Sequence, residues 1–195
     1  MGGSFDPIHL GHLAIAEFAR THFGLDTVVF VPAGQPWQKQ PEAAAVHRYQ
    51  MVRLAVADHE HFQVSRIEVD RPGPTYTVDT LRELHRAAPD DQWWFIAGAD
   101  SMVTMASWRE PDAVLDLATF VAVTRPGHDL ADLADSPYHG RITPLVVPSP
   151  AISSTQVRTC LAAGQSVAEL IPAAVEDYIR RHGLYGAELQ EAAGQ

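Results

Sequence analysis

The stretch GGSFDPIHLGH, residues 2–12, carries the densest information in this chain. Its two glycines let backbone N–H groups approach a phosphate closely, and the serine that follows adds a hydroxyl group. The pair Asp6 and Pro7 favours a turn that leads into a helix beginning near Leu10. The stretch therefore predicts an anion-binding loop at the start of a helix.

Two histidines stand at the start of this predicted helix. His9 and His12 are three residues apart and share one helix face, and we expect Gly11 between them to leave room for a bulky ligand. The helix N-terminus favours a bound anion, and imidazoles there can donate hydrogen bonds to a phosphate. Their protonation states stay open, because the helix dipole disfavours imidazolium whereas a polyphosphate favours it. The alternatives are surface histidines or a zinc pair, although no third ligand follows at a usual spacing.

Outward from this stretch, short apolar runs alternate with helical patterns. We expect strands at residues 27–31, 93–97, 119–124 and 145–147, and helices at 10–22, 46–57, 78–87, 111–117, 155–163 and 172–183. This alternation predicts an α/β fold, a Rossmann-like, doubly wound and mostly parallel sheet with helices on both faces. Ligands of such sheets bind beyond the carboxyl ends of the strands. We further expect a surface loop over 125–141, one domain over 1–185 and a frayed tail over 186–195.

Composition excludes several classes of protein. A chain of 195 residues with 46% hydrophobic residues is long enough for one well-buried core. A formal charge of −10 argues against broad nucleic-acid or membrane binding, but a pocket for a phosphorylated small molecule can still be locally basic. Cys160 is the only cysteine, which fits a reducing compartment, and we expect a cytoplasmic protein. The oligomeric state stays open, a homo-oligomer included.

A second polar stretch, ISSTQVR at residues 152–158, precedes another predicted helix. Serine and threonine at a helix start usually cap it, and this is the structural alternative. Arg158 lies three residues beyond Thr155, one turn up the same face, where it can reach oxygens held at the helix start. Capping alone does not require this arginine, so the stretch predicts a second anion-binding segment.

Together the two stretches resemble the signatures of the nucleotidylyltransferase superfamily, His-x-Gly-His after a glycine loop and Ile-Ser-Ser-Thr-x-x-Arg. The resemblance spans nearly the whole chain and implies an ATP site made of Gly2, Gly3, Ser4, Phe5, His9, His12, Ser153, Ser154, Thr155 and Arg158. Of these, His9, His12 and Arg158 are the expected catalytic residues. The superfamily places a strand directly before the loop, so we expect the first strand to be missing here; whether the native start lies upstream of Met1 stays open.

Three middle segments resemble the branch that uses nicotinate mononucleotide: GPTYTVDTL at 73–81, Ser-Trp-Arg at 107–109 and Gly-x-Asp at 98–100. A loop over residues 32–39 that ends in a lysine resembles the family's phosphate-binding loop. The resemblance implies a mononucleotide site made of Lys39, Arg48, Thr77, Asp100, Trp108 and Arg109. The alternatives are that the threonine caps a helix, the aspartate starts one, the tryptophan fills core space, and the lysine and Arg48 are solvated surface charges. For Arg48 the surface alternative is favoured.

The resemblance to bacterial nicotinate-nucleotide adenylyltransferases implies a reaction. We expect adenylyl transfer from ATP to nicotinate mononucleotide, giving nicotinate adenine dinucleotide and pyrophosphate in NAD biosynthesis. Mg²⁺ would arrive with ATP, because no dedicated set of metal-binding carboxylates is visible. Adenylylation of nicotinamide mononucleotide or of another phosphate acceptor stays open, as does an inactive nucleotide-binding regulator.

Overall fold

The computed structural model describes residues 1–38, 40–124 and 131–188, and for residues 131 and 132 it describes the backbone only. Lys39 therefore lies outside the described residues. None of the helices in the described ranges is long and apolar enough to cross a membrane.

Six strands form two parallel sheets within these ranges. Their neighbours run in the order β3-β2-β1 and β4-β5-β6, and β1 lies beside β4. Read across both sheets, the order reverses between β1 and β4, where a doubly wound fold places its ligand. The strands are β1 Gly2–Gly3, β2 Val28–Pro32, β3 Phe62–Val64, β4 Trp94–Gly98, β5 Thr119–Thr124 and β6 Ile142–Val146.

The two glycines of the first stretch form a strand, which differs from the expectation of a loop with no strand before it. Gly2 pairs with Val31 and Gly3 with Pro32, and the Val31 N–H donates to the Met1 carbonyl at 2.9 Å. Because β1 has only two residues, it covers only the carboxyl end of β2. Within the described residues the two sheets are consequently not joined by hydrogen bonds, and a gap runs between β2 and β4.

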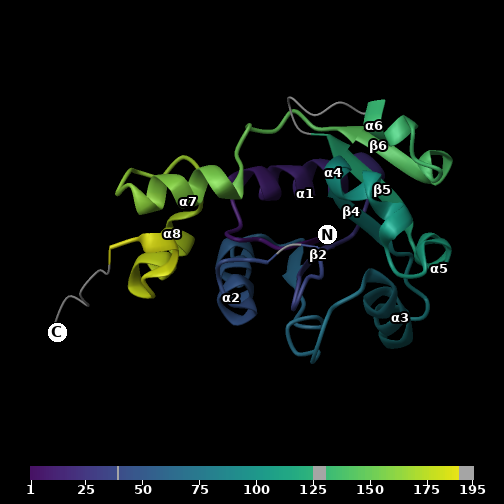
Figure 1. Ribbon diagram of the computed structural model, residues 1–195, viewed down its shortest axis with the longest axis horizontal. Coiled ribbons are helices and arrows are strands. Elements are labelled where there is room, and N and C mark those ends of the chain that lie inside the picture. The colour runs from purple at the N-terminus through teal and green to yellow at the C-terminus, as the bar shows by residue number, and fades with distance from the viewer. Residues whose placement is uncertain (39, 125–130, 189–195) are drawn as a thin grey trace.

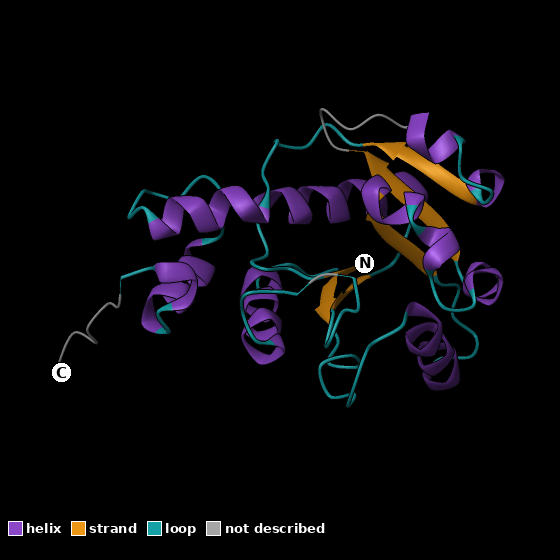
Figure 2. Ribbon diagram, viewed as in Figure 1, coloured by secondary structure: helices purple, strands orange, loops and turns teal. Residues whose placement is uncertain are grey.

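The helices alternate with the strands as expected (Figures 1 and 2). The helices in the described ranges are α1 Leu10–Phe23, α2 Ala45–Val56, α3 Thr77–Ala87, α4 Ala99–Val103, η1 Met105–Ser107, α5 Pro111–Leu117, α6 Ala131–Ala134, η2 His139–Arg141, α7 Ser154–Ala162, α8 Ala173–Arg181 and η3 Leu184–Gly186. The expected helices lie within two residues of their predicted bounds. Strand β3, the short helix α6 and the 3-10 helices were not expected.

The expected surface loop over 125–141 needs correction. Residues 125–130 lie outside the described ranges, but α6 and η2 are helical. Leu133 in α6 is buried among the residues that cover β5, and this burial supplies the apolar contact that a short helix needs. At the other end of the chain, Gly186 closes η3 and Ala187 is buried, while residues 189–195 lie outside the described ranges.

The core explains why helices cover both faces of the sheet β4-β5-β6. Alternate residues of a strand point to opposite faces. One face packs against α3, α4 and α5 and includes Ala97, Phe120 and Ala122. The other face packs against α1 and includes Ile96, Val121 and Leu145. Helix α1 contributes Ile15 and Ala19 to the second face, and Leu13 and Ala16 to a third cluster with Phe30 of β2. Helix α1 thus ties the two sheets together and holds its N-terminus where the strand order reverses.

Candidate active site

A cleft of about 1230 Å³ lies at the carboxyl ends of β1, β2 and β4 and continues into the gap between the sheets. Residues from both ends of the chain line it. Of the expected ATP-site residues, those in the lining are Gly2, Gly3, Ser4, Phe5, His12, Ser153, Ser154, Thr155 and Arg158. Of the expected mononucleotide-site residues, they are Thr77, Asp100, Trp108 and Arg109.

The two polar stretches touch each other directly. The Ser154 hydroxyl donates to the Pro7 carbonyl at 2.9 Å, and Arg158 Nη1 donates to the Asp6 carbonyl at 2.9 Å. Figure 1 shows the reason, because α7 starts beside the first turn of α1. Segments about 150 residues apart in sequence therefore form one rim of the cleft.

The two histidines form a stacked pair at the start of α1. Their ring centroids lie 3.6 Å apart, and the planes are 26° from parallel. The His12 N–H points to Nδ1 of His9 at 3.3 Å, and the His9 N–H points to Nδ1 of His12 at 3.2 Å. A ring nitrogen that accepts an N–H carries no proton, so each neutral ring holds its proton on Nε2. The arrangement thus leaves Nε2 as the donor of a neutral ring.

Only one of these histidines lines the cleft. His12 is 8% exposed and belongs to the lining, whereas His9 is 1% exposed and lies behind it. The alternative of two surface histidines is therefore wrong. The structure also gives Gly11 a packing reason: a Cβ there would lie 3.0 Å from Nδ1 of His9, so a side chain would crowd the stacked ring.

Asp6 joins three parts of the chain, which the sequence did not indicate. Its buried carboxylate accepts the N–H groups of Glu42 at 2.8 Å and Ala43 at 3.1 Å, and the hydroxyl of Tyr185 at 2.7 Å. Burial and the neighbouring carboxylate raise the pKa of the Tyr185 hydroxyl, which keeps it a hydrogen-bond donor. Asp6 thereby fixes the segment before α2 and the C-terminal η3 beside the first stretch.

The second stretch combines capping with cleft lining. The Ser153 hydroxyl accepts the Gln156 N–H at 3.1 Å and caps α7, so the capping alternative is right for this serine. Arg158 follows one turn later. Its Nε forms an ion pair with Glu42 at 2.5 Å, and its side chain is 23% exposed.

Arg48 is the largest departure from the sequence expectation. The surface alternative is wrong, because the residue is 1% exposed. Its guanidinium donates to the carbonyls of Ala43 at 3.0 Å, Ser4 at 2.7 Å and Gly34 at 3.1 Å. Burial lowers the pKa of Arg48, and the charge of Asp6 opposes this shift. The side chain thus joins the first stretch to the loop after β2 and lies behind the cleft lining.

The tryptophan expected to stack on a ring is half-buried at the opposite rim. Trp108 meets Phe95 and Phe120 edge-on, with centroids 6.1 and 6.4 Å apart, and its Nε1 donates to the Thr104 hydroxyl at 3.4 Å. It therefore both packs on the core and lines the cleft. Thr77 is the first residue of α3, and the N-cap residue, Tyr76, makes no side-chain capping bond.

Two glycines allow close approaches along the cleft. A Cβ at Gly98 would collide with the carboxylate of Asp100 at the start of α4, and a Cβ at Gly34 would collide with the Glu68 carbonyl. Glu68 accepts the Thr80 hydroxyl at 2.8 Å, and burial raises the pKa of its carboxyl group. The sequence pointed to the first glycine, but only the fold reveals the second.

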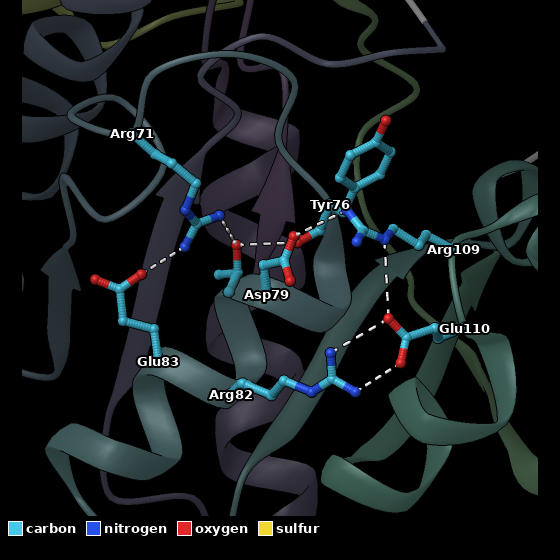
Figure 3. A network of polar contacts seen from close by, with 8 residues as sticks. Arg71, Tyr76, Asp79, Arg82, Glu83, Arg109 and Glu110 are labelled. Carbon is cyan, nitrogen blue, oxygen red and sulfur yellow. Dashed lines mark hydrogen bonds and ion pairs between the residues drawn. The ribbon is translucent and has the colours of Figure 1, made fainter.

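A network of charged side chains borders the rim of the cleft at Arg109 and the start of α3 (Figure 3). The Arg109 guanidinium lies 3.7 Å from Asp79 and 3.8 Å from Glu110, and 5.0 Å above the ring of Tyr76. Arg82 pairs with Glu110 at 2.6 Å and links the rim to α3. The exposed Arg109 is thus held beside the start of α3, where an anionic group of a ligand would meet it.

No cluster of three metal-binding side chains occurs within the described ranges.

Comparison with known proteins identifies similar chains. A family model described as cytidylyltransferase-like matches residues 1–160. A probable nicotinate-nucleotide adenylyltransferase of Paenarthrobacter aurescens (strain TC1) is 49% identical over 194 residues, 98% of this chain and 92% of the relative. One from Thermus thermophilus is 51% identical over 184 residues, 94% of this chain and 96% of the relative. The structure of Plasmodium falciparum nicotinic acid mononucleotide adenylyltransferase complexed with NaAD shares the fold, with TM-score 0.79, 21% identity and 97% of each chain covered.

Proposed function

Because this chain belongs to the cytidylyltransferase-like family and, within it, to the nicotinate-nucleotide adenylyltransferases, we propose that it transfers the AMP unit of ATP to nicotinate mononucleotide. The products are nicotinate adenine dinucleotide, an intermediate of NAD biosynthesis, and pyrophosphate. The observation that carries this proposal is the convergence of His12 and Arg158, from opposite ends of the chain, on one cleft.

The nucleotide lies at the meeting point of the two stretches. The backbone of β1 and the Ser4 hydroxyl face its phosphates, and the N-terminus of α1 adds oriented N–H groups. Nε2 of His12 donates to the α-phosphate, and His9 holds that ring in place by stacking and by accepting the His12 N–H. Ser154, Thr155 and Arg158 hold the leaving pyrophosphate.

The chemical step is an in-line displacement without a covalent enzyme intermediate. The attacking phosphate of the mononucleotide is already ionised, so no general base is required. Catalysis comes from positioning the two substrates and from stabilising charge on the α-phosphate and the leaving group. Mg²⁺ enters as part of the MgATP substrate.

The mononucleotide lies against the opposite rim. The indole of Trp108 stacks on the cationic pyridine ring, and the start of α3, at Thr77, receives the nicotinate carboxylate. Arg109 adds attraction to that carboxylate, and Asp100 faces the ribose. Lys39, outside the described residues, stays a candidate for the mononucleotide phosphate.

Arg48 contributes to the site by holding backbone carbonyls in place. It holds the Ser4 carbonyl on the nucleotide side and the Gly34 carbonyl on the mononucleotide side, so it fixes the distance between the two half-sites. We therefore assign it a positioning role in place of direct contact with the mononucleotide.

A substrate panel tests the proposal. Pyrophosphate release is measured with ATP or CTP, each combined with nicotinate mononucleotide, nicotinamide mononucleotide or no acceptor. We expect the highest kcat/KM for ATP with nicotinate mononucleotide. A higher value with the amide would reassign the acceptor, and no release in any combination would identify a binding protein without turnover.

A further inference from the structure

Arg158, the cation assigned to the leaving phosphates, already holds an anion. Its Nε lies 2.5 Å from Oε1 of Glu42, while its Nη1 donates to the Asp6 carbonyl at 2.9 Å. One edge of the guanidinium is thus tied to the backbone of the first stretch, and the Nε side carries a carboxylate from the segment before α2.

The backbone of Glu42 is held in this position. Its N–H donates to Oδ2 of Asp6 at 2.8 Å, and the next residue, Ala43, donates to Oδ1 at 3.1 Å. The Ala43 carbonyl in turn accepts Nε of Arg48 at 3.0 Å. The side chain differs from this anchored backbone, because it is 58% exposed and can leave Arg158 without disturbing the core.

A carboxylate and a phosphate are alternative partners for the same guanidinium, because both place anionic oxygens beside its positive charge. We propose that Glu42 is a further residue of the nucleotide site: its carboxylate occupies on Arg158 the place of a leaving phosphate oxygen, and ATP displaces it. This inference rests on the proposed function, which assigns those phosphates to Arg158. Two anions so close together repel each other, so the site binds polyphosphate less tightly than it would without Glu42.

The exchange also favours product release. After adenylyl transfer the carboxylate returns to Arg158 and replaces the pyrophosphate oxygen there. No bond is made or broken in this step, and only the partner of the guanidinium changes. Ligands without the two leaving phosphates, such as AMP, do not compete with Glu42.

The substitution Glu42→Gln tests this role, because it keeps the size of the side chain and removes its charge. Calorimetry measures the affinities for pyrophosphate, a non-hydrolysable ATP analogue and AMP. From the usual strength of a partly exposed ion pair we expect about 2–5-fold tighter binding of pyrophosphate and of the analogue, with AMP unchanged. Glu176→Gln is the matched control: Glu176 pairs with Arg180 at 2.7 Å on α8, away from the cleft lining, and should change none of the three affinities.

Equal or weaker binding of pyrophosphate to Glu42→Gln would overturn the inference, because Glu42 would then position Arg158 without competing. Glu42→Ala repeats the comparison with the side chain removed, and thermal melts of both variants verify the fold. If the wild-type protein binds pyrophosphate and releases it in turnover, and both variants bind pyrophosphate with the wild-type affinity, only the role of Glu42 fails. If the wild-type protein binds no nucleotide, the proposed function fails as well.

Discussion

The replacement of the buried Arg48 by methionine probes how the two half-sites are held together. Methionine fills a similar volume but cannot donate, so the carbonyls of Ser4, Gly34 and Ala43 each lose a partner. Three lost hydrogen bonds to a buried charged group predict a loss of about 3–5 kcal/mol in the free energy of unfolding. For a chain of this size, that loss lowers Tm by about 6–20 °C.

Urea unfolding followed by circular dichroism measures this loss, and Arg53→Met is the matched control. Arg53 lies on the same helix and is exposed, and its guanidinium donates to Gln50 at 2.9 Å, so its replacement should change stability by about 0.5 kcal/mol or less. Steady-state kinetics below the melting range should show a raised KM for both ATP and nicotinate mononucleotide. If Arg48→Met keeps near wild-type stability and raises only the KM for the mononucleotide, the positioning role is refuted. Direct contact between Arg48 and the mononucleotide would then be the better assignment.

Further predictions concern the cleft itself. His12→Ala should lower kcat by at least ~10²-fold with an unchanged circular dichroism spectrum, and unaltered turnover would remove the histidine from the mechanism. Trp108→Ala should raise the KM for the mononucleotide more than the KM for ATP in steady-state assays; the reverse order would contradict the stacking assignment. Gly34→Ala should lower Tm and raise the mononucleotide KM because its Cβ meets the Glu68 carbonyl, whereas Gly140→Ala, where a Cβ meets nothing within 4 Å, should have neither effect. Burial raises the pKa of Glu68 in the folded state, so its contribution to stability is fully present below the unfolded pKa near 4.5 and falls as pH rises through the folded value. Melting curves at pH 5 and pH 7 should therefore show that Glu68→Gln gains stability relative to wild type at the higher pH. The same difference in Tm between variant and wild type at both pH values would contradict a raised pKa for Glu68.

Local patterns in the sequence were sufficient for most elements. The helices beginning near Leu10 and Pro111 and the strand Thr119–Thr124 follow from apolar periodicity and from turn residues at their ends. Elements of two to four residues escaped prediction, because so short a segment carries no periodicity. The strand Gly2–Gly3 exists through pairing with β2, and α6 is accompanied by burial of Leu133.

The sequence by itself indicated which segments are suited to bind anions, because hydroxyls, histidines and glycines at a helix start suit a phosphate wherever the helix lies. It did not determine which charges remain available at the site. Arg48 reads as a surface cation and Asp6 as a turn former, yet the fold buries both among partners from distant segments. Only tertiary structure decided these roles, because whether a buried charge is stable depends on acceptors and donors that chain folding brings to it from far along the sequence.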